Sequence, residues 1–167
     1  APKSPLASVK DMTSTPPPRQ LVVIGGGMVA RRLIDALRVR DEAGQWTVTL
    51  LCEEPRAPYD RVALTSYFTG RDPEDLALGG QEIWDDPLVT IRRGVAATGI
   101  DREARTVATS DGRTLAYDSL VLATGSYAAV PPVPGKDLRG AFVYRTIDDV
   151  ADLRAYVEAL RAEHARP

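Results

Sequence analysis

The residues whose types and spacing could do chemistry begin with three glycines, Gly25 to Gly27, followed by Met28, Val29 and Ala30. They directly follow an apolar run, 21–24, and open a helical pattern. Glycine lets the chain turn tightly and lets a pyrophosphate approach the backbone, and a small residue at position 30 suits packing of helix on strand. Free amides and the positive dipole end at the helix start would hold the phosphates, so Arg31 and Arg32 are expected to take no part. The pattern therefore predicts a dinucleotide site.

The residues after the glycines favour this interpretation. Apolar residues recur at helical spacing, at Val29, Leu33, Ile34 and Leu37. A second apolar run, 47–51, leads into Glu53 and Glu54, where this kind of fold places an acid on the adenosine ribose. A plain strand-to-helix turn that binds nothing is the alternative. The order of elements predicts the α/β class, with a Rossmann-like parallel sheet and helices.

Cysteine and histidine are each present once, as Cys52 and His164. One cysteine cannot form an internal disulfide or, by itself, a zinc or iron–sulfur site. At the end of a predicted buried strand, we expect Cys52 to be an unreactive core thiol, with a reactive thiol as the alternative. We expect no metal site and no catalytic side chain, so redox chemistry would have to come from a bound cofactor.

The composition is typical of a globular domain. The chain has 167 residues, 44% of them apolar and 26% charged, and a net charge of -2. This charge predicts no nucleic-acid surface, and no apolar run is long enough to cross a membrane. Residues 1–19, rich in Pro, Ser and Thr, are expected to be a disordered leader. Because they hold no secretory apolar stretch, we expect a cytoplasmic location.

A long excursion, 55–87, separates the second strand from the next one, with helical pieces around 64–68 and 81–84. It exceeds what a simple crossover needs, so we expect it to cover the ligand. Arg61 lies near the end of the second strand and could reach a phosphate. A solvated proline turn with Arg61 on the surface is the alternative.

Short β-like segments follow the excursion, at 89–92, 95–100, 106–109 and 114–117. We assign them to a small antiparallel element with a hairpin turn at 110–112. A further buried strand, 119–123, breaks at Thr124 and Gly125, which suits a second approach of the backbone to the same ligand.

Residues 146–165 have the pattern of an amphipathic helix. Thr146 and Asp149 suit a capping box, and an apolar stripe runs through 150, 153, 157 and 160. The adjacent carboxylates at 148–149 are explained by favourable charge in the first helical turn, and those at 85–86 by a solvated turn. Neither pair is interpreted as an acid and base.

In order and spacing, these motifs resemble the FAD-binding part of the pyridine-nucleotide-dependent flavoprotein reductases, over residues 20–155. Within that superfamily they are most similar to the large subunits of assimilatory NAD(P)H nitrite reductases. The strings that carry the resemblance are Cys52-Glu53-Glu54-Pro55-Arg56, Tyr59-Asp60-Arg61-Val62, Ser66-Tyr67-Phe68, Ala123-Thr124-Gly125-Ser126-Tyr127 and Tyr144-Arg145-Thr146-Ile147-Asp148-Asp149.

The resemblance implies a set of cofactor-binding positions. They are Gly25, Gly27, Met28, Val29, Glu53, Glu54, Arg61, Ala97, Ala123, Thr124, Gly125 and Arg145. The glycines and first helical amides would hold the FAD pyrophosphate, and Glu53 or a neighbouring residue would bond the adenosine ribose. Arg61 would lie against the phosphates or the adenine side, Ala97 would meet adenine through its backbone, and Thr124 with Gly125 would pack near the pyrophosphate.

The resemblance also implies a function and partners. NAD(P)H would pass hydride to FAD, and electrons would continue to siroheme and an iron–sulfur cluster outside this chain, reducing nitrite to ammonium. We expect residues 20–145 to be part of the FAD-binding domain and residues 146–167 to lead toward an NAD(P)H domain. A terminal helix that packs on the sheet is the alternative for this last segment. The remaining domains and a small subunit would be the partners, and this chain alone should not reduce nitrite. The alternatives are a rubredoxin or ferredoxin reductase, an NAD-dependent dehydrogenase, and a non-catalytic adenine-dinucleotide-binding module.

Overall fold

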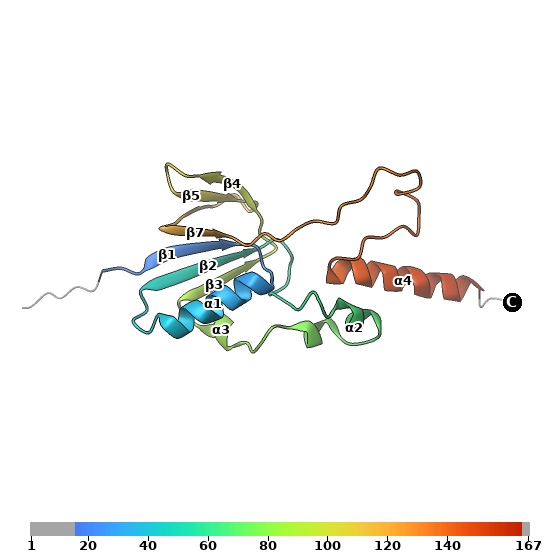
Figure 1. Cartoon of the computed structure of the whole chain (residues 1–167), viewed down its shortest axis with the longest axis horizontal. Helices are drawn as coiled ribbons and strands as arrows, with labels where there is room; N and C mark the ends of the chain where they lie inside the picture. The colour runs from blue at the N-terminus through green and yellow to red at the C-terminus, as the bar shows by residue number, and fades with distance from the viewer. Residues whose placement is uncertain (1–15, 165–167) are drawn as a thin grey trace, which may run out of the picture.

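The computed structural model describes residues 16–164, and its centre is a four-stranded parallel sheet (Figure 1). The spatial order of the strands is β3-β2-β1-β7. They are β1 (Arg19–Ile24), β2 (Trp46–Cys52), β3 (Val89–Arg93) and β7 (Ser119–Leu122). Helix α1 (Met28–Arg40) connects β1 to β2 and covers one face of the sheet (Figure 1). This is the Rossmann-like arrangement that the sequence predicts.

Both faces of the central strands are buried, which explains their nearly continuous apolar sequence. Val23 and Leu50 point to the α1 side, where they pack with Ile34. Val22, on the opposite face of β1, packs in a second cluster with Val107. All of these side chains are at most 2% exposed. The core therefore lies directly beneath the carboxyl ends of β1 and β2 and fixes their position.

The second face is covered by a three-stranded antiparallel sheet. Its strands are β4 (Ala97–Asp101), β5 (Thr106–Thr109) and β6 (Thr114–Ala116), in the order β4-β5-β6. The assignment of residues 89–92 to this antiparallel element is wrong, because β3 pairs in parallel with β2, with Val89 opposite Val48. Val89 joins the same buried cluster as Val48, so burial on the α1 side draws this segment to the edge of the parallel sheet.

The excursion after β2 contains the predicted helical pieces and holds the last helix. Its elements are α2 (Leu64–Phe68), η1 (Pro73–Leu76) and α3 (Glu82–Asp85). The final helix, α4 (Ile147–His164), packs on α2 and lies away from the central sheet (Figure 1). The apolar cluster between them contains Tyr59, Leu64, Tyr67, Leu76, Ile147 and Val150. Part of the excursion therefore docks α4, whereas α3 packs against the core on the α1 side through Trp84.

Arg31 joins α1 to this excursion and is only 7% exposed. Its Nε donates to the Asp35 carboxylate at 3.0 Å, and its guanidinium lies 4.9 Å from the centre of the Trp84 ring. Its Nη1 also donates to the carbonyl oxygen of Gly80 at 3.4 Å. Arg31 does not line the cavity described below. Its buried contacts serve the fold, because they join α1 to the excursion.

The ends of the chain lie largely outside the described part. Residues 1–15 of the predicted leader and residues 165–167 fall outside it, and β1 begins at Arg19, one residue before the predicted domain boundary. Within residues 16–164, no helix combines the length and apolar character needed to span a bilayer.

Candidate functional site

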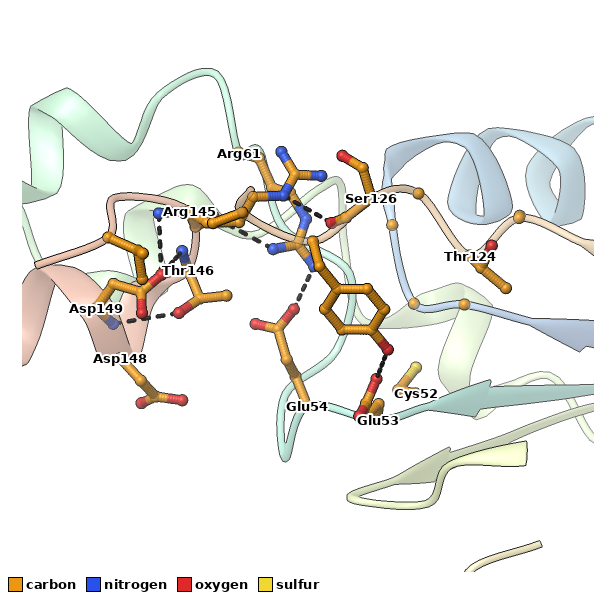
Figure 2. A pocket seen from close by; sticks show the side chains of 18 of the residues that line it. Cys52, Glu53, Glu54, Arg61, Thr124, Ser126, Arg145, Thr146, Asp148 and Asp149 are labelled. Atoms are coloured by element: carbon orange, nitrogen blue, oxygen red, sulfur yellow. Dashed lines mark hydrogen bonds and ion pairs between the residues drawn. The ribbon is translucent and has the colours of Figure 1, made fainter. Parts of the chain in front are cut away.

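A cavity of about 460 Å³ opens at the carboxyl ends of β1, β2 and β7 (Figure 2). This edge is where open α/β sheets bind their ligands. Three separate segments form the wall: the glycine turn, the end of β2 with the start of the excursion, and the chain after β7 with the start of α4. The predicted residues that line it are Gly25, Gly27, Glu53, Glu54, Arg61, Ala123, Thr124, Gly125 and Arg145.

The glycine turn presents bare backbone to this cavity. Gly27 caps α1, and a Cβ added there would meet no atom of the described chain within 4 Å. Protein packing therefore does not require glycine at this position, whereas a ligand approaching the backbone would. The side chains of Met28 and Val29 do not line the cavity, so the contribution expected of these two residues is their first-turn N–H groups.

Glu54 lies in a compact cluster with Tyr59 and Arg61. Its carboxylate pairs with the Arg61 guanidinium and accepts a hydrogen bond from the Tyr59 hydroxyl at 2.8 Å. Arg61 also donates to the Tyr59 oxygen at 2.9 Å. Burial and the Glu54 hydrogen bond raise the pKa of Tyr59 to about 12, so this hydroxyl stays a donor at neutral pH. Glu54 thus holds Arg61 at the cavity wall, and both of its oxygens are engaged.

Glu53 differs from Glu54 because its side chain is exposed. Its Oε2 accepts a hydrogen bond from the Tyr127 hydroxyl at 2.8 Å. Glu53 also lines a second hollow of about 150 Å³, to which Ala97 contributes. The predicted adenine contact, Ala97, therefore lies beside the main cavity and outside its wall.

The chain after β7 and the start of α4 are held together by hydrogen bonds (Figure 2). Arg145 donates from Nε to the carbonyl oxygen of Ser126 at 2.9 Å. Asp149 accepts from the Thr146 N–H at 2.7 Å, and the Thr146 hydroxyl accepts from the Asp149 N–H at 3.1 Å. The predicted capping box is therefore present.

The adjacent carboxylates have structural partners. Asp148 accepts from Arg56 at 2.7 and 2.8 Å, and these bonds lower the pKa of Asp148. Asp86 accepts from Arg38 Nε at 2.9 Å. Both contacts join distant segments. Asp86 thus has an ion-pair partner that the predicted solvated turn at 85–86 did not include, and Asp148 has one in addition to the predicted favourable charge in the first helical turn.

Cys52 lies at the floor of the cavity but is 1% exposed. Burial raises its pKa to about 12, which keeps the thiol neutral. The buried position agrees with the predicted core thiol. Its low reactivity remains a prediction.

Sequence reasoning gave no role to several residues of this site. Ser126 and Tyr127 belong to the motif string after β7. Their position shortly after the end of a strand is the sequence feature that could have marked them as site residues. Tyr59 belongs to a motif string too, and Asp148 had a predicted role only in the helical turn. The contacts of both depend on how the excursion meets α4. These contacts join residues separated by up to 92 positions in sequence.

The arrangement fits an adenine dinucleotide. Backbone amides and the Arg61 and Arg145 guanidinium groups can bind phosphate oxygens, and the Glu53 carboxylate can accept from ribose hydroxyls. The two adjoining hollows share Gly25, Glu53 and Thr124 in their walls.

Comparison with known proteins agrees with this geometry. Residues 19–162 match the family profile described as pyridine nucleotide-disulphide oxidoreductase. The chain is 43% identical over 141 residues to the nitrite reductase [NAD(P)H] large subunit of Klebsiella oxytoca, which covers 84% of this chain and 15% of that protein. It is 36% identical over 135 residues to rhodocoxin reductase of Rhodococcus erythropolis, covering 80% of this chain and 31% of that one.

A solved structure gives the same picture. The ferredoxin reductase for the CYP199A2 system from Rhodopseudomonas palustris superposes with a TM-score of 0.76 at 26% identity, covering 84% of this chain and 35% of that one. The chain thus spans less than two fifths of each of these three relatives. Because the family profile matches most of its length, the chain belongs to the pyridine nucleotide-disulphide oxidoreductase family.

Proposed function

We propose that this chain is the FAD-binding segment of an NAD(P)H-dependent flavoprotein reductase, the electron-entry part of a nitrite reductase that converts nitrite to ammonium. The observation that carries the FAD site is the bare Gly27 backbone facing the cavity at the start of α1. The 43% identity to a nitrite reductase large subunit supports the choice within the family.

Each side of the cavity has a separate role in this proposal. The amides at the start of α1 hold the pyrophosphate, and Arg61 and Arg145 add positive charge beside it. Glu53 accepts from the adenosine ribose, and the backbone near Ala97 meets the adenine. FAD, when bound, supplies the redox chemistry, while the side chains bind and orient it. Siroheme and the iron–sulfur cluster belong, in this proposal, to other parts of the protein.

The same proposal implies which domains and partners surround this segment in the whole protein. Residues 20–145 form part of the FAD-binding domain, and α4 leads toward an NAD(P)H-binding domain. The position of α4 supports this, because its first turn lines the cavity through Asp148 and Asp149 while the rest of the helix extends away (Figure 1). The other domains and a small subunit are the proposed partners, and the cytoplasm is the proposed location.

A second candidate is a reductase that delivers electrons to a ferredoxin-like or rubredoxin-like protein. The 36% identity to rhodocoxin reductase favours it specifically. The two candidates differ in the electron acceptor. Measuring NAD(P)H oxidation by the whole protein with nitrite, and separately with a ferredoxin, distinguishes them.

The FAD site itself is tested by titrating the purified chain with FAD and following flavin fluorescence. We expect saturable binding that ADP displaces and FMN does not. Gly27→Ala should weaken FAD binding at least about tenfold, because its methyl group enters the space that the pyrophosphate needs.

The matched control is Gly99→Ala in β4. A Cβ there would make only an ordinary contact, 3.9 Å from the Cβ of Ala108, and Gly99 lines neither hollow. Equal effects of the two substitutions, or no FAD binding by the folded wild-type chain, would contradict the proposed site.

A further inference from the structure

Tyr127 and Glu53 form an isolated pair on the surface. The Tyr127 side chain is 82% exposed, yet its hydroxyl donates to Glu53 Oε2 at 2.8 Å across 74 positions of sequence. Within residues 16–164, this is the one side-chain hydrogen bond that either residue makes. The pair therefore depends chiefly on where the backbone places the two residues.

The backbone next to Tyr127 is anchored. Arg145 Nε donates to the carbonyl oxygen of Ser126 at 2.9 Å, directly before Tyr127. Gly125, two residues earlier, adopts a φ of 69°. The anchored turn thus presents the tyrosine toward the end of β2, where Glu53 lies.

The pair also has a particular position relative to the two hollows. Gly25, Glu53, Thr124 and Tyr127 line both of them. Tyr127 engages only Oε2, so the described part of the chain leaves Oε1 of Glu53 available to a ligand at this boundary. A ribose that joins a base in the small hollow to phosphates in the large one would cross the same boundary.

We propose that Tyr127 is a positioning residue for ribose recognition, holding Glu53 through Oε2 so that Oε1 can accept from the adenosine ribose. This inference rests on the proposed FAD site. An exposed glutamate otherwise samples many rotamers, and restricting it before binding lowers the entropy lost when the ribose arrives. The Glu53 hydrogen bond raises the pKa of Tyr127, so the hydroxyl remains a neutral donor at physiological pH.

The test compares ADP with 2′,3′-dideoxy-ADP by calorimetric titration of the purified chain. Tyr127→Phe keeps the ring and removes the hydroxyl. We expect it to weaken ADP binding about three- to tenfold and to leave dideoxy-ADP binding unchanged. In a Glu53→Ala background, which removes the acceptor, the same substitution should add little, because it acts through the carboxylate. Tyr144→Phe is the matched control, since Tyr144 is 47% exposed and lines neither hollow.

The outcomes separate the two proposals. If the wild-type chain binds neither FAD nor ADP, the proposed FAD site and this inference both fail. If it binds ADP but Tyr127→Phe has no effect, or weakens both nucleotides equally, only the role of Tyr127 is overturned. If Tyr127→Phe weakens the binding of ADP but not that of dideoxy-ADP, the proposed role of Tyr127 is supported.

Discussion

A Cβ atom at Gly25 would lie 2.2 Å from the carbonyl oxygen of Ala123. The turns after β1 and β7 are thus in direct backbone contact. Gly25 also has a φ of 112°, which side chains rarely tolerate. Any side chain at Gly25 would have to push the two turns apart.

We therefore expect Gly25→Ala to lower the free energy of unfolding by about 3 kcal/mol or more, measured by urea denaturation. Gly27→Ala should lower it by no more than about 1 kcal/mol, because its methyl group meets no described atom within 4 Å and only the N-cap preference for glycine over alanine is lost. Similar stability of the two variants would contradict the geometry of this turn.

Removing Arg61 should destabilise the chain through Glu54. Arg61→Met leaves a carboxylate that is 22% exposed without its guanidinium partner. We expect a loss of about 1–3 kcal/mol at pH 7. In a Glu54→Gln background the same change should cost less, since no charge is left unpaired. Additive losses in this double-mutant cycle, measured by urea denaturation, would show that the two residues act independently.

The ion pair between Arg56 and Asp148 should contribute stability that depends on pH. Folding lowers the pKa of Asp148 below its ordinary value of 3.8, chiefly through the hydrogen bonds from Arg56. The contribution is therefore present above pH 3.8 and is lost as the pH falls through the folded-state pKa. Asp148→Asn should cost about 0.5–1 kcal/mol at pH 7 and nothing once the pH is low enough to protonate the native carboxylate. Asp152→Asn, on the exposed side of the same helix, is the control, and a cost that stays constant with pH would argue against the ion pair.

Cys52 should resist alkylation in the folded chain. A pKa of about 12 in place of 9.0 lowers the thiolate fraction at pH 8 about a thousandfold, and the side chain is 1% exposed. Mass spectrometry should show slow labelling by iodoacetamide under native conditions and fast labelling in urea. Equal rates in the two conditions would mean that the thiol is accessible and reactive.

The parallel core and its glycine turn could be predicted because they depend on local patterns. Buried strands such as 47–51 are continuous apolar runs, and the turn needs glycine at fixed positions. The pairing of β3 could not be predicted in this way. A five-residue β-like segment fits either sheet, and only packing of Val89 on the α1 side decides between them.

Side-chain partners, both in the fold and within the site, were less predictable. Arg31 lies among the polar positions of α1 in sequence, but it is buried because α3 brings Trp84 against it. Glu53 and Glu54 are adjacent and chemically identical. Only the path of the excursion determines that Arg61 forms its ion pair with Glu54. Local sequence gives the type of each group, whereas the tertiary contact determines its role.

The central position of β1 has a consequence for biosynthesis. β1 pairs on one side with β2 and on the other with β7, whose first residue lies 95 positions after the end of β1. The cavity wall therefore cannot be complete when β1, α1 and β2 leave the ribosome, because residues 123–128 are its opposite side. Capture of the proposed ligand must then follow synthesis of the segment after β7, and until then one edge of β1 exposes unpaired backbone groups that a chaperone or another strand could bind.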